Sequence, residues 1–197
     1  MTDDAIYEQA VSRFHELLRR ATESPLREPA AAVLATIDAA EQPAARVVLI
    51  RGADLRGFVF FTNDQSSKGR QLAANPKAAL CVYWDSLREQ VRIEGAVESV
   101  AANESDAYWQ TRPRDSQIGA WASSQSEPLP DRATLEDRFT NFEKKFAGRD
   151  VPRPEHWRGY RLAPTRIEFW SGRDARLHER VEYRRVGPRW TVGLLYP

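Results

Sequence analysis

The hydrophobic pattern divides the chain into a helical start and a longer region of mixed structure. Residues 5–22 carry apolar side chains every three or four positions, which predicts one amphipathic helix. Pro25 and Pro29 exclude its continuation, because proline lacks a backbone N–H and clashes with the preceding helical turn. We therefore expect residues 1–28 to form a helix with its connector and residues 29–197 to form a single domain.

From residue 30 onward, short runs of β-branched and aromatic residues alternate with turn residues. These runs predict strands over residues 31–37, 45–51, 57–62, 78–84, 90–100, 159–162, 166–170, 177–183 and 190–195. Helical spacing predicts further helices over residues 66–74, 103–111, 116–123 and 132–146. Strands on both sides of an inserted group of helices indicate an α+β domain built on a closed or nearly closed antiparallel β-barrel.

Composition and charge narrow the class of protein. The 197 residues are 42% hydrophobic and 29% charged, which excludes disordered and low-complexity chains. The net charge is only +1, so the sequence gives no support for a nucleic-acid partner. No apolar run approaches the ~18 residues of a membrane span. The acidic residues 1–4 lack the basic start of a signal peptide, so we expect neither a membrane segment nor export.

Cysteine and histidine usage bears on compartment and metal content. Cys81 is the one cysteine and lies in an apolar run, so no internal disulfide can form and a cytoplasmic location is expected. This cysteine and the three histidines do not have the spacing of zinc ligands. No metal site is therefore predicted.

A first group of polar residues follows two of the predicted strands. Arg46 and Arg51 lie on one strand, and Thr62, Ser67 and Lys68 lead from another strand into a helix start. Backbone N–H groups and the helix dipole favour an anion at such a start, so a phosphate site is one interpretation. The spacing is not that of a P-loop, and the two arginines face opposite sides of a regular strand. Taken alone, an ordinary capped helix explains the group slightly better.

A second group surrounds a predicted break between two helices. Pro113 should end the first helix, and Asp115 or Ser116 can cap the next. This places Tyr108, Arg112 and a serine hydroxyl around a helix N-terminus, which suits a phosphate. A purely structural helix–turn–helix explains the same residues equally well.

A third group lies near the C-terminus. If residues 177–183 and their neighbours form a strand, Arg176, His178 and Arg180 share one face of it. Three cationic or titratable side chains in a row are costly unless they face water or an anion. A catalytic histidine is one interpretation, and a solvated edge strand is the simpler one.

Taken together, these groups resemble one enzyme family. The run R-P-R-D-S-Q-I-G-A-W begins at Arg112, and the motifs Q-S, I-E-F-W and R-L-H follow it from Gln125, Ile167 and Arg176. In this order and spacing they resemble pyridoxine/pyridoxamine 5′-phosphate oxidase, from about Pro29 to Pro197. The resemblance implies an FMN-binding split β-barrel, a homodimer with FMN at the subunit interface, and no hydrolytic nucleophile–base pair.

The resemblance also implies roles for individual residues. FMN would be bound by Arg46, Val47, Val48, Leu49, Ile50, Arg51, Phe61, Thr62, Ser67, Lys68, Gln90, Gln125, Ser126, Trp170 and Arg180. The substrate would be bound by Arg51, Tyr108, Arg112, Ser116, Arg176, Leu177 and His178, with Arg176 and His178 as the catalytic pair over the substrate ring.

The reaction implied is the oxidation of a small phosphorylated pyridine. Hydride passes from substrate C4′ to flavin N5. Pyridoxine 5′-phosphate then gives pyridoxal 5′-phosphate directly, whereas pyridoxamine 5′-phosphate gives an imine that water hydrolyses to pyridoxal 5′-phosphate with release of ammonia. O2 then reoxidises the flavin and gives H2O2. The cofactor supplies the redox chemistry, and the protein supplies binding and orientation.

Three positions depart from the family pattern. Arg51 stands where the family usually has lysine, which keeps the charge and changes its geometry. Ser67 stands where the family often has arginine beside the phosphate-binding lysine, so one charge-assisted contact is lost. The basic N-terminal segment of some members has no match in this chain.

Two alternatives remain open, one within the same class and one from another. One is an oxidase of the same fold acting on another substrate, as in the phenazine-biosynthesis relatives; the phosphate-binding pattern that begins at Arg112 favours the vitamin B6 substrate. The other is a non-catalytic FMN-binding carrier or sensor, which would bind FMN without consuming O2. A nucleic-acid-binding barrel has no support from the charge.

Overall fold

The computed structural model describes residues 3–197, so the start of the chain at residues 1 and 2, part of the acidic segment named above, lies outside the described residues. The helices are α1 (Asp3–Thr22), α2 (Ser67–Ala74), α3 (Ala102–Gln110), α4 (Arg114–Ala122) and α5 (Arg132–Lys145), with short 3-10 turns η1 (Asp85–Leu87) and η2 (Asp174–Arg176). The strands are β1 (Ala31–Ile37), β2 (Pro43–Leu49), β3 (Gly52–Asp54), β4 (Gly57–Asn63), β5 (Lys77–Trp84), β6 (Glu89–Ser99), β7 (Trp157–Ser171), β8 (Glu179–Val186) and β9 (Arg189–Leu195). No described helix is long and apolar enough to cross a membrane.

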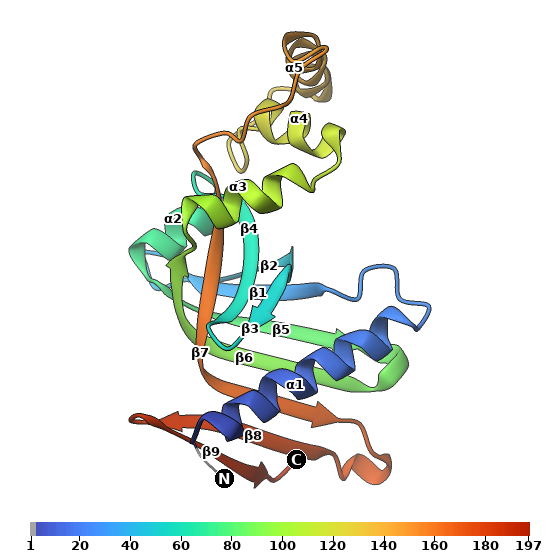
Figure 1. Ribbon diagram of the computed structural model, residues 1–197, viewed down its shortest axis with the longest axis vertical. Coiled ribbons are helices and arrows are strands. Elements are labelled where there is room, and N and C mark those ends of the chain that lie inside the picture. The colour runs from blue at the N-terminus through green and yellow to red at the C-terminus, as the bar shows by residue number, and fades with distance from the viewer. Residues whose placement is uncertain (1–2) are drawn as a thin grey trace.

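All strands belong to one antiparallel sheet that curls into a barrel (Figure 1). The strands follow the order β2-β1-β5-β6-β7-β4-β3, so β2 and β3 are the two ends of this path. The chain passes from β2 to β3 through Ile50 and Arg51 alone, and the Arg51 N–H donates to the Val59 carbonyl of β4 at 2.7 Å. The barrel therefore closes at this crossing. The predicted strand over residues 45–51 was shifted, because Arg51 lies after β2 and not within it.

The longest strand, β7, explains how the barrel extends into a second arm. Its first half pairs with β4, its second half pairs with β8, and β6 lies along its other edge. The sequence predicted two strands here, 159–162 and 166–170, because Pro164 interrupts the pattern. Pro164 instead lies opposite Gly95, where the register of β6 shifts. The regular pattern of hydrogen bonds between β6 and β7 is already interrupted there, so the N–H that proline lacks is not needed. A Cβ at Gly95 would lie 2.0 Å from the Ala163 carbonyl oxygen, so only glycine fits this close approach.

The main hydrophobic core fills the barrel and is covered by α1. Figure 1 shows α1 lying across the barrel and beside the β8–β9 hairpin. Phe14 of α1 is 1% exposed and packs edge-on against Phe58 of β4, with their ring centroids 4.9 Å apart. Tyr7 stacks on Trp190 of β9 at 4.7 Å. The amphipathic face predicted over residues 5–22 thus joins the two arms of the sheet.

Replacing Phe14 with alanine should lower the free energy of unfolding by about 3–5 kcal/mol, because it removes a buried ring and leaves a cavity. Urea denaturation followed by circular dichroism measures this change. The exposed residue Gln9 of the same helix provides the control, since Gln9→Ala should change stability by no more than about 0.5 kcal/mol. Equal effects of the two substitutions would contradict the packing described for α1.

A second, smaller core holds the inserted helices at one end of the barrel. Trp109 of α3 is buried beside Trp157 at the start of β7, and its indole N–H donates to the Val151 carbonyl at 2.8 Å. Phe146 follows α5 and packs against Trp121 of α4. Figure 1 shows α3, α4 and α5 stacked above the barrel, at the opposite end from the β8–β9 hairpin.

Candidate functional site

Two cations lie together where α2 begins. The guanidinium of Arg46 donates to Thr36 Oγ1 at 2.5 Å and to Gln71 Oε1 at 2.7 Å. The ammonium of Lys68 donates to Thr62 Oγ1 at 3.2 Å and to Gln125 Oε1 at 3.1 Å. Neither side chain forms an ion pair with a carboxylate among the described residues, so this end of α2 carries two positive charges held only by neutral groups.

The environment of Lys68 opposes its charge. Burial lowers the pKa of Lys68 below its usual range, and the positive charge of Arg46 lowers it further. Burial also lowers the pKa of Arg46. A bound anion would relieve both effects, because it supplies the missing opposite charge.

The backbone of α2 adds to the same anion preference. Ser66 is the N-cap, and its hydroxyl accepts a hydrogen bond from the Gly69 N–H. A Cβ at residue 69 would lie 2.1 Å from the Asp64 carbonyl oxygen, so glycine is required for the first turn to pack this closely. The first turn holds no acidic residue, which leaves the positive end of the helix dipole uncompensated.

A second cationic site lies between the inserted helices and β7. The Arg112 guanidinium carbon lies 4.8 Å from the Trp157 ring centroid and 5.2 Å from that of Trp109. Its Nη1 atom is buried and has no hydrogen-bond partner among the described residues. Burial lowers the pKa of Arg112, and the nearby charge of Arg51 lowers it as well. A buried guanidinium nitrogen without a partner is costly, so this geometry favours an anionic ligand.

Two adjoining clefts connect these sites. A cleft of 580 Å³ is lined by residues that include Arg51, Tyr108 and Arg112, and a cleft of 320 Å³ reaches from Arg112 to Thr62 and Gln125. Both clefts share Phe61, Arg112, Ser116 and Trp157 as lining residues. Phe61 stacks on Tyr108 at 4.2 Å and on Trp157 at 5.2 Å, which gives the clefts a flat aromatic wall.

Helix α4 points its N-terminus toward these clefts. It begins at Arg114, two residues earlier than predicted, and its N-cap is Pro113. Neither Asp115 nor Ser116 caps it, as the sequence analysis had proposed. Ser116 instead lies in the first turn and lines both clefts, where the helix dipole favours a negative charge.

A third group occupies the far arm of the sheet. Gln90 of β6 lies opposite Trp170 of β7, and Trp170 lies opposite Arg180 of β8. The rings of His178 and Trp170 are 4.6 Å apart. His178 Nδ1 accepts a hydrogen bond from the Arg173 backbone N–H at 3.1 Å, so the neutral ring carries its proton on Nε2.

The prediction that Arg176, His178 and Arg180 share one strand face is wrong. Strand β8 begins at Glu179, and Arg176 ends the 3-10 turn η2, with φ values of 53° at Ala175 and 60° at Arg176. Leu177 is 71% exposed in the same loop. A tight turn therefore presents Arg176, Leu177 and His178, which a strand would have sent to alternate faces.

A single chain does not bring the second and third groups together. Trp157, in the cleft wall, and Trp170, beside His178, lie 13 residues apart on β7, which spans about 40 Å of extended chain. In Figure 1 the α3–α4 end and the loop between β7 and β8 lie at opposite ends of the molecule. The candidate residues thus lie in two separate regions of each chain.

The other residues predicted to bind FMN lie in different surroundings. Val48 and Ile50 are buried in the core, Val47 is exposed, and Leu49 lines the larger cleft. Ser67 is the first residue of α2. Ser126 follows Gln125 in a turn and has a φ of 74°.

Several contact residues were missed by sequence reasoning. Thr36 and Gln71 hold Arg46, Ser66 contacts Lys68, and the Glu168 carboxylate accepts from Arg180 Nε at 2.8 Å. Gln71 could have been predicted, because it lies one helical turn after Ser67 and therefore on the same face of the predicted helix. The contact of Thr36 depends on strand register, which periodicity does not reveal.

Comparison with known proteins identifies the family. Residues 18–146 match the family model of pyridoxamine 5′-phosphate oxidase, and residues 157–197 match that of the pyridoxine 5′-phosphate oxidase C-terminal dimerisation region. The chain belongs to the pyridoxine/pyridoxamine 5′-phosphate oxidase family. The part of the sheet that carries Trp170 and Arg180 is therefore this family's dimerisation region.

Individual members of the pyridoxine/pyridoxamine 5′-phosphate oxidase family match nearly the whole chain. The Myxococcus xanthus (strain DK1622) enzyme is 52% identical over 187 residues, which cover 95% of this chain and 91% of the relative. The Thermosynechococcus vestitus enzyme is 54% identical over 190 residues, which cover 96% and 90%. PhzG from Burkholderia lata 383, solved in complex with tetrahydrophenazine-1-carboxylic acid, superposes with a TM-score of 0.90 at 33% identity, covering 95% of this chain and 92% of PhzG.

These findings confirm several sequence predictions. An FMN-binding protein from Nostoc punctiforme, related to pyridoxamine 5′-phosphate oxidase, has a TM-score of 0.77 at 19% identity and shares the fold. The α+β FMN-binding split barrel is thus confirmed. The chain is an oxidoreductase of the pyridoxine/pyridoxamine 5′-phosphate oxidase family, and FMN is confirmed as the cofactor of that family.

Substitution of Lys68 tests the anion site at α2. Lys68→Met should raise the Kd for FMN roughly 10- to 100-fold, since it removes one charge-assisted contact. The apoprotein should become more stable at pH 7, because a lysine whose folded pKa is lowered costs stability while it is charged. That gain should shrink as the pH rises from the folded pKa toward the unfolded value.

Flavin fluorescence quenching measures the affinity, and urea denaturation of the apoprotein measures the stability. The exposed Lys77 provides the control: Lys77→Met should leave the Kd unchanged. A Lys68→Met protein that binds FMN as tightly as the wild type would show that α2 is not the phosphate site.

Proposed function

We propose that the protein is an FMN-dependent oxidase that converts pyridoxine 5′-phosphate and pyridoxamine 5′-phosphate to pyridoxal 5′-phosphate. The observation that carries this proposal is the pair of cationic sites, one at α2 and one at Arg112, joined by clefts with an aromatic wall. A phosphorylated cofactor and a phosphorylated aromatic substrate each need one such anion site. The 52–54% identity to enzymes of this name supports the same reading.

The residues at α2 fit the phosphate of FMN. Arg46 and Lys68 supply two charges without carboxylate partners among the described residues, and the α2 N-terminus supplies backbone N–H groups and a favourable dipole. Thr62 and Gln125 already hold the lysine and border the smaller cleft. Ser67 adds no charge there, so Arg46 and Lys68 carry the electrostatic part of binding.

The residues around Arg112 fit the phosphate of the substrate. Arg112 offers the unpartnered buried Nη1, Arg51 adds a second charge in the same cleft, and the Tyr108 and Ser116 side chains line it. Phosphate oxygens are strong acceptors that match a guanidinium geometrically. The aromatic wall beside this site suits a planar pyridine ring.

The active site is completed by a second copy of the chain. Trp170 and Arg180 lie in the arm that matches the dimerisation region, and Gln90 of β6 pairs with Trp170, so all three are remote from the clefts of their own chain. A twofold homodimer places this arm of one subunit against the cleft of the other, and each dimer then has two equivalent sites with FMN at the interface. Arg176, Leu177 and His178 reach the substrate from the same arm.

FMN, when bound, would supply the redox chemistry, with N5 as the acceptor of the substrate C4′ hydride and O2 as the oxidant that restores the flavin with formation of H2O2. The side chains of the protein bind the substrate and orient it. Arg112 and Arg51 fix the substrate through its phosphate, and such fixing supplies the entropic part of catalysis. His178 presents its Nε2–H as a hydrogen-bond donor, because Nδ1 is occupied by the Arg173 N–H. Arg176 adds positive charge beside it.

The second candidate function is that of an oxidase of the same fold that acts on another substrate. The observation that supports this candidate is the close superposition on PhzG. The two candidates differ in their need for a substrate phosphate. Oxygen consumption with pyridoxine 5′-phosphate, pyridoxamine 5′-phosphate, unphosphorylated pyridoxine and a reduced phenazine carboxylic acid separates them. Turnover of the two phosphates, with one H2O2 formed per pyridoxal 5′-phosphate, supports the proposal. Turnover of the phenazine alone supports the second candidate, and FMN binding without any turnover supports a carrier.

A further inference from the structure

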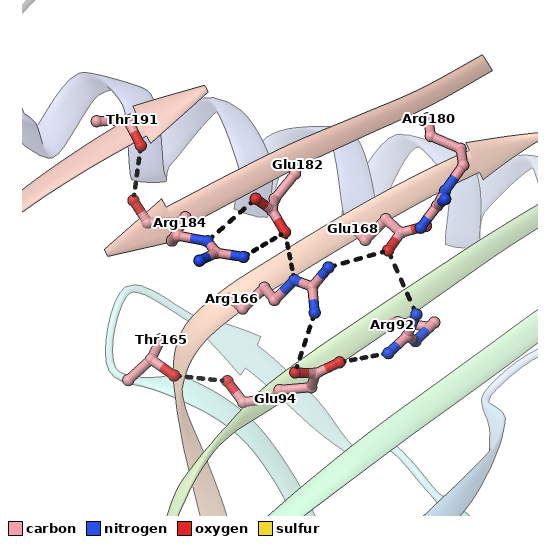
Figure 2. Close-up of polar contacts among 9 residues, drawn as sticks. All are labelled: Arg92, Glu94, Thr165, Arg166, Glu168, Arg180, Glu182, Arg184 and Thr191. Carbon is pink, nitrogen blue, oxygen red and sulfur yellow. Dashed lines mark hydrogen bonds and ion pairs between the residues drawn. The ribbon is translucent and has the colours of Figure 1, made fainter. Parts of the chain in front are cut away.

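Charged side chains from β6, β7 and β8 form one connected network on the sheet (Figure 2). Its members are Arg92, Glu94, Arg166, Glu168, Arg180, Glu182 and Arg184. The side chain of Glu168 is 3% exposed, and it is the most deeply buried of the set. A carboxylate so deeply buried must gain from its partners what it loses in hydration.

Glu168 has three arginine partners, and its contact with Arg180 is the shortest. The Arg180 Nε atom lies 2.8 Å from Glu168 Oε1, whereas Arg92 Nη1 and Arg166 Nη2 lie 3.4 Å and 3.6 Å from Oε2. Arg92 and Arg166 each have another carboxylate partner, Glu94 for both. Glu168 is the one carboxylate that pairs with Arg180 among the described residues.

Arg180 is fixed from two sides. Its Nε donates to Glu168, and its Nη1 donates to the Tyr196 carbonyl oxygen at 2.8 Å. Its Nη2 makes no hydrogen bond with the described residues. The guanidinium plane is therefore set by the protein, and one nitrogen is left for a ligand beside Trp170, the register partner of Arg180 on β7.

We propose that Glu168 is a positioning residue, which orients Arg180 for contact with FMN. This inference rests on the proposed function, in which Arg180 touches the cofactor. An arginine held in one orientation before binding loses less side-chain entropy when it meets its ligand than a free one does. Outer partners of metal-ligating residues act in this way, and their removal costs about 10- to 100-fold in metal affinity or activity.

The test compares two substitutions that remove the same charge from the same network. Glu168→Gln removes the partner of Arg180, whereas Glu182→Gln removes a partner of Arg166 and Arg184 and does not touch Arg180. Using the full-length dimeric protein, we expect Glu168→Gln to raise the Kd for FMN roughly tenfold. We expect Glu182→Gln to leave the Kd within about twofold of the wild type, because it leaves both hydrogen bonds of Arg180, to Glu168 and to the Tyr196 carbonyl, in place. Flavin fluorescence quenching gives both values.

A double-substitution cycle separates positioning from general stability. Arg180→Ala should also weaken FMN binding, and adding Glu168→Gln to it should cause no further loss. The more conservative Glu168→Asp keeps the negative charge on a shorter side chain, so it should weaken FMN binding less than Glu168→Gln does. This variant replaces Glu168→Gln in the test if the glutamine variant fails to fold. Thermal unfolding of each apoprotein reports the purely structural contribution.

The outcomes distinguish this inference from the proposed function. Equal changes in Kd for Glu168→Gln and Glu182→Gln, or additive losses in the cycle, would overturn the positioning role and leave the oxidase proposal standing. An Arg180→Ala protein with wild-type affinity would remove Arg180 from the cofactor site, and Glu168 with it. A wild-type protein that does not bind FMN would overturn both proposals.

Discussion

Arg112→Met should lower kcat/KM for pyridoxine 5′-phosphate by about 100-fold, the equivalent of roughly 3 kcal/mol for a charge-assisted contact to phosphate. Methionine is unbranched and apolar, so it fills space beside Trp109 and Trp157 while removing the guanidinium that lies over their rings and its buried Nη1, which has no partner among the described residues. The fold should survive, because the substitution removes a desolvated charge and breaks no ion pair of the described residues. Steady-state oxygen consumption with FMN at saturation gives the number.

The unphosphorylated substrate is the matched control for Arg112. Pyridoxine offers no phosphate, so its kcat/KM, low from the outset, should be the same in the wild type and in Arg112→Met. Arg51→Met should reduce kcat/KM for the phosphorylated substrate by about tenfold, less than Arg112→Met, because Arg51 is exposed and its charge is screened by solvent. Equal losses on both substrates would mean that Arg112 supports the cleft wall and does not bind phosphate.

Subunit complementation should restore activity to a pair of inactive variants. Arg112→Met damages the cleft, and Arg176→Ala damages the loop in the dimerisation arm. In a heterodimer with one subunit of each kind, one site receives both substitutions and the other receives neither. Heterodimers isolated through two different affinity tags should therefore show about half the wild-type activity per dimer.

A second pair of variants is the control for complementation. Arg112 lines the smaller cleft and Lys68 contacts Gln125, which lines it too, so Lys68→Met and Arg112→Met both lie in the cleft half of the site. At an FMN concentration that fills the wild type but not Lys68→Met, their heterodimer should have one damaged cleft in each site and recover no activity. If the heterodimer of Arg112→Met with Arg176→Ala also stays inactive, each site is built within one chain, contrary to our assignment.

The sequence predicted much of the barrel, because the two periodicities that define strands and helices are local. It predicted two strands where β7 is one, because Pro164 reads as a break unless the register shift opposite it at Gly95 is known. The sequence also predicted Arg51 to lie within a strand, because the end of pairing depends on long-range contacts. The apolar run continues to Ile50, although the sheet pairing ends at Leu49, where the chain crosses to close the barrel.

Prediction of the site depended on resemblance more than on pattern. Helix-start chemistry pointed to Lys68 and Ser116, but the partners that hold Arg46 come from β1 and α2 and depend on long-range pairing. The turn at Arg176 has positive φ values at Ala175 and Arg176, and neither residue is a glycine that would mark such a conformation in the sequence. Glu168 belongs to a motif that the sequence analysis quoted, and its contact with Arg180 becomes visible only when β7 and β8 are paired.

One anaerobic titration tests the central claim most directly. The purified protein is loaded with FMN, oxygen is removed, and the visible absorbance of the oxidised flavin is followed as pyridoxine 5′-phosphate is added. We expect the absorbance to fall to completion at one equivalent of substrate per bound FMN, with pyridoxal 5′-phosphate formed, and to return with release of H2O2 when air is admitted. A bound flavin whose absorbance is unchanged by both pyridoxine and pyridoxamine 5′-phosphates would contradict the account.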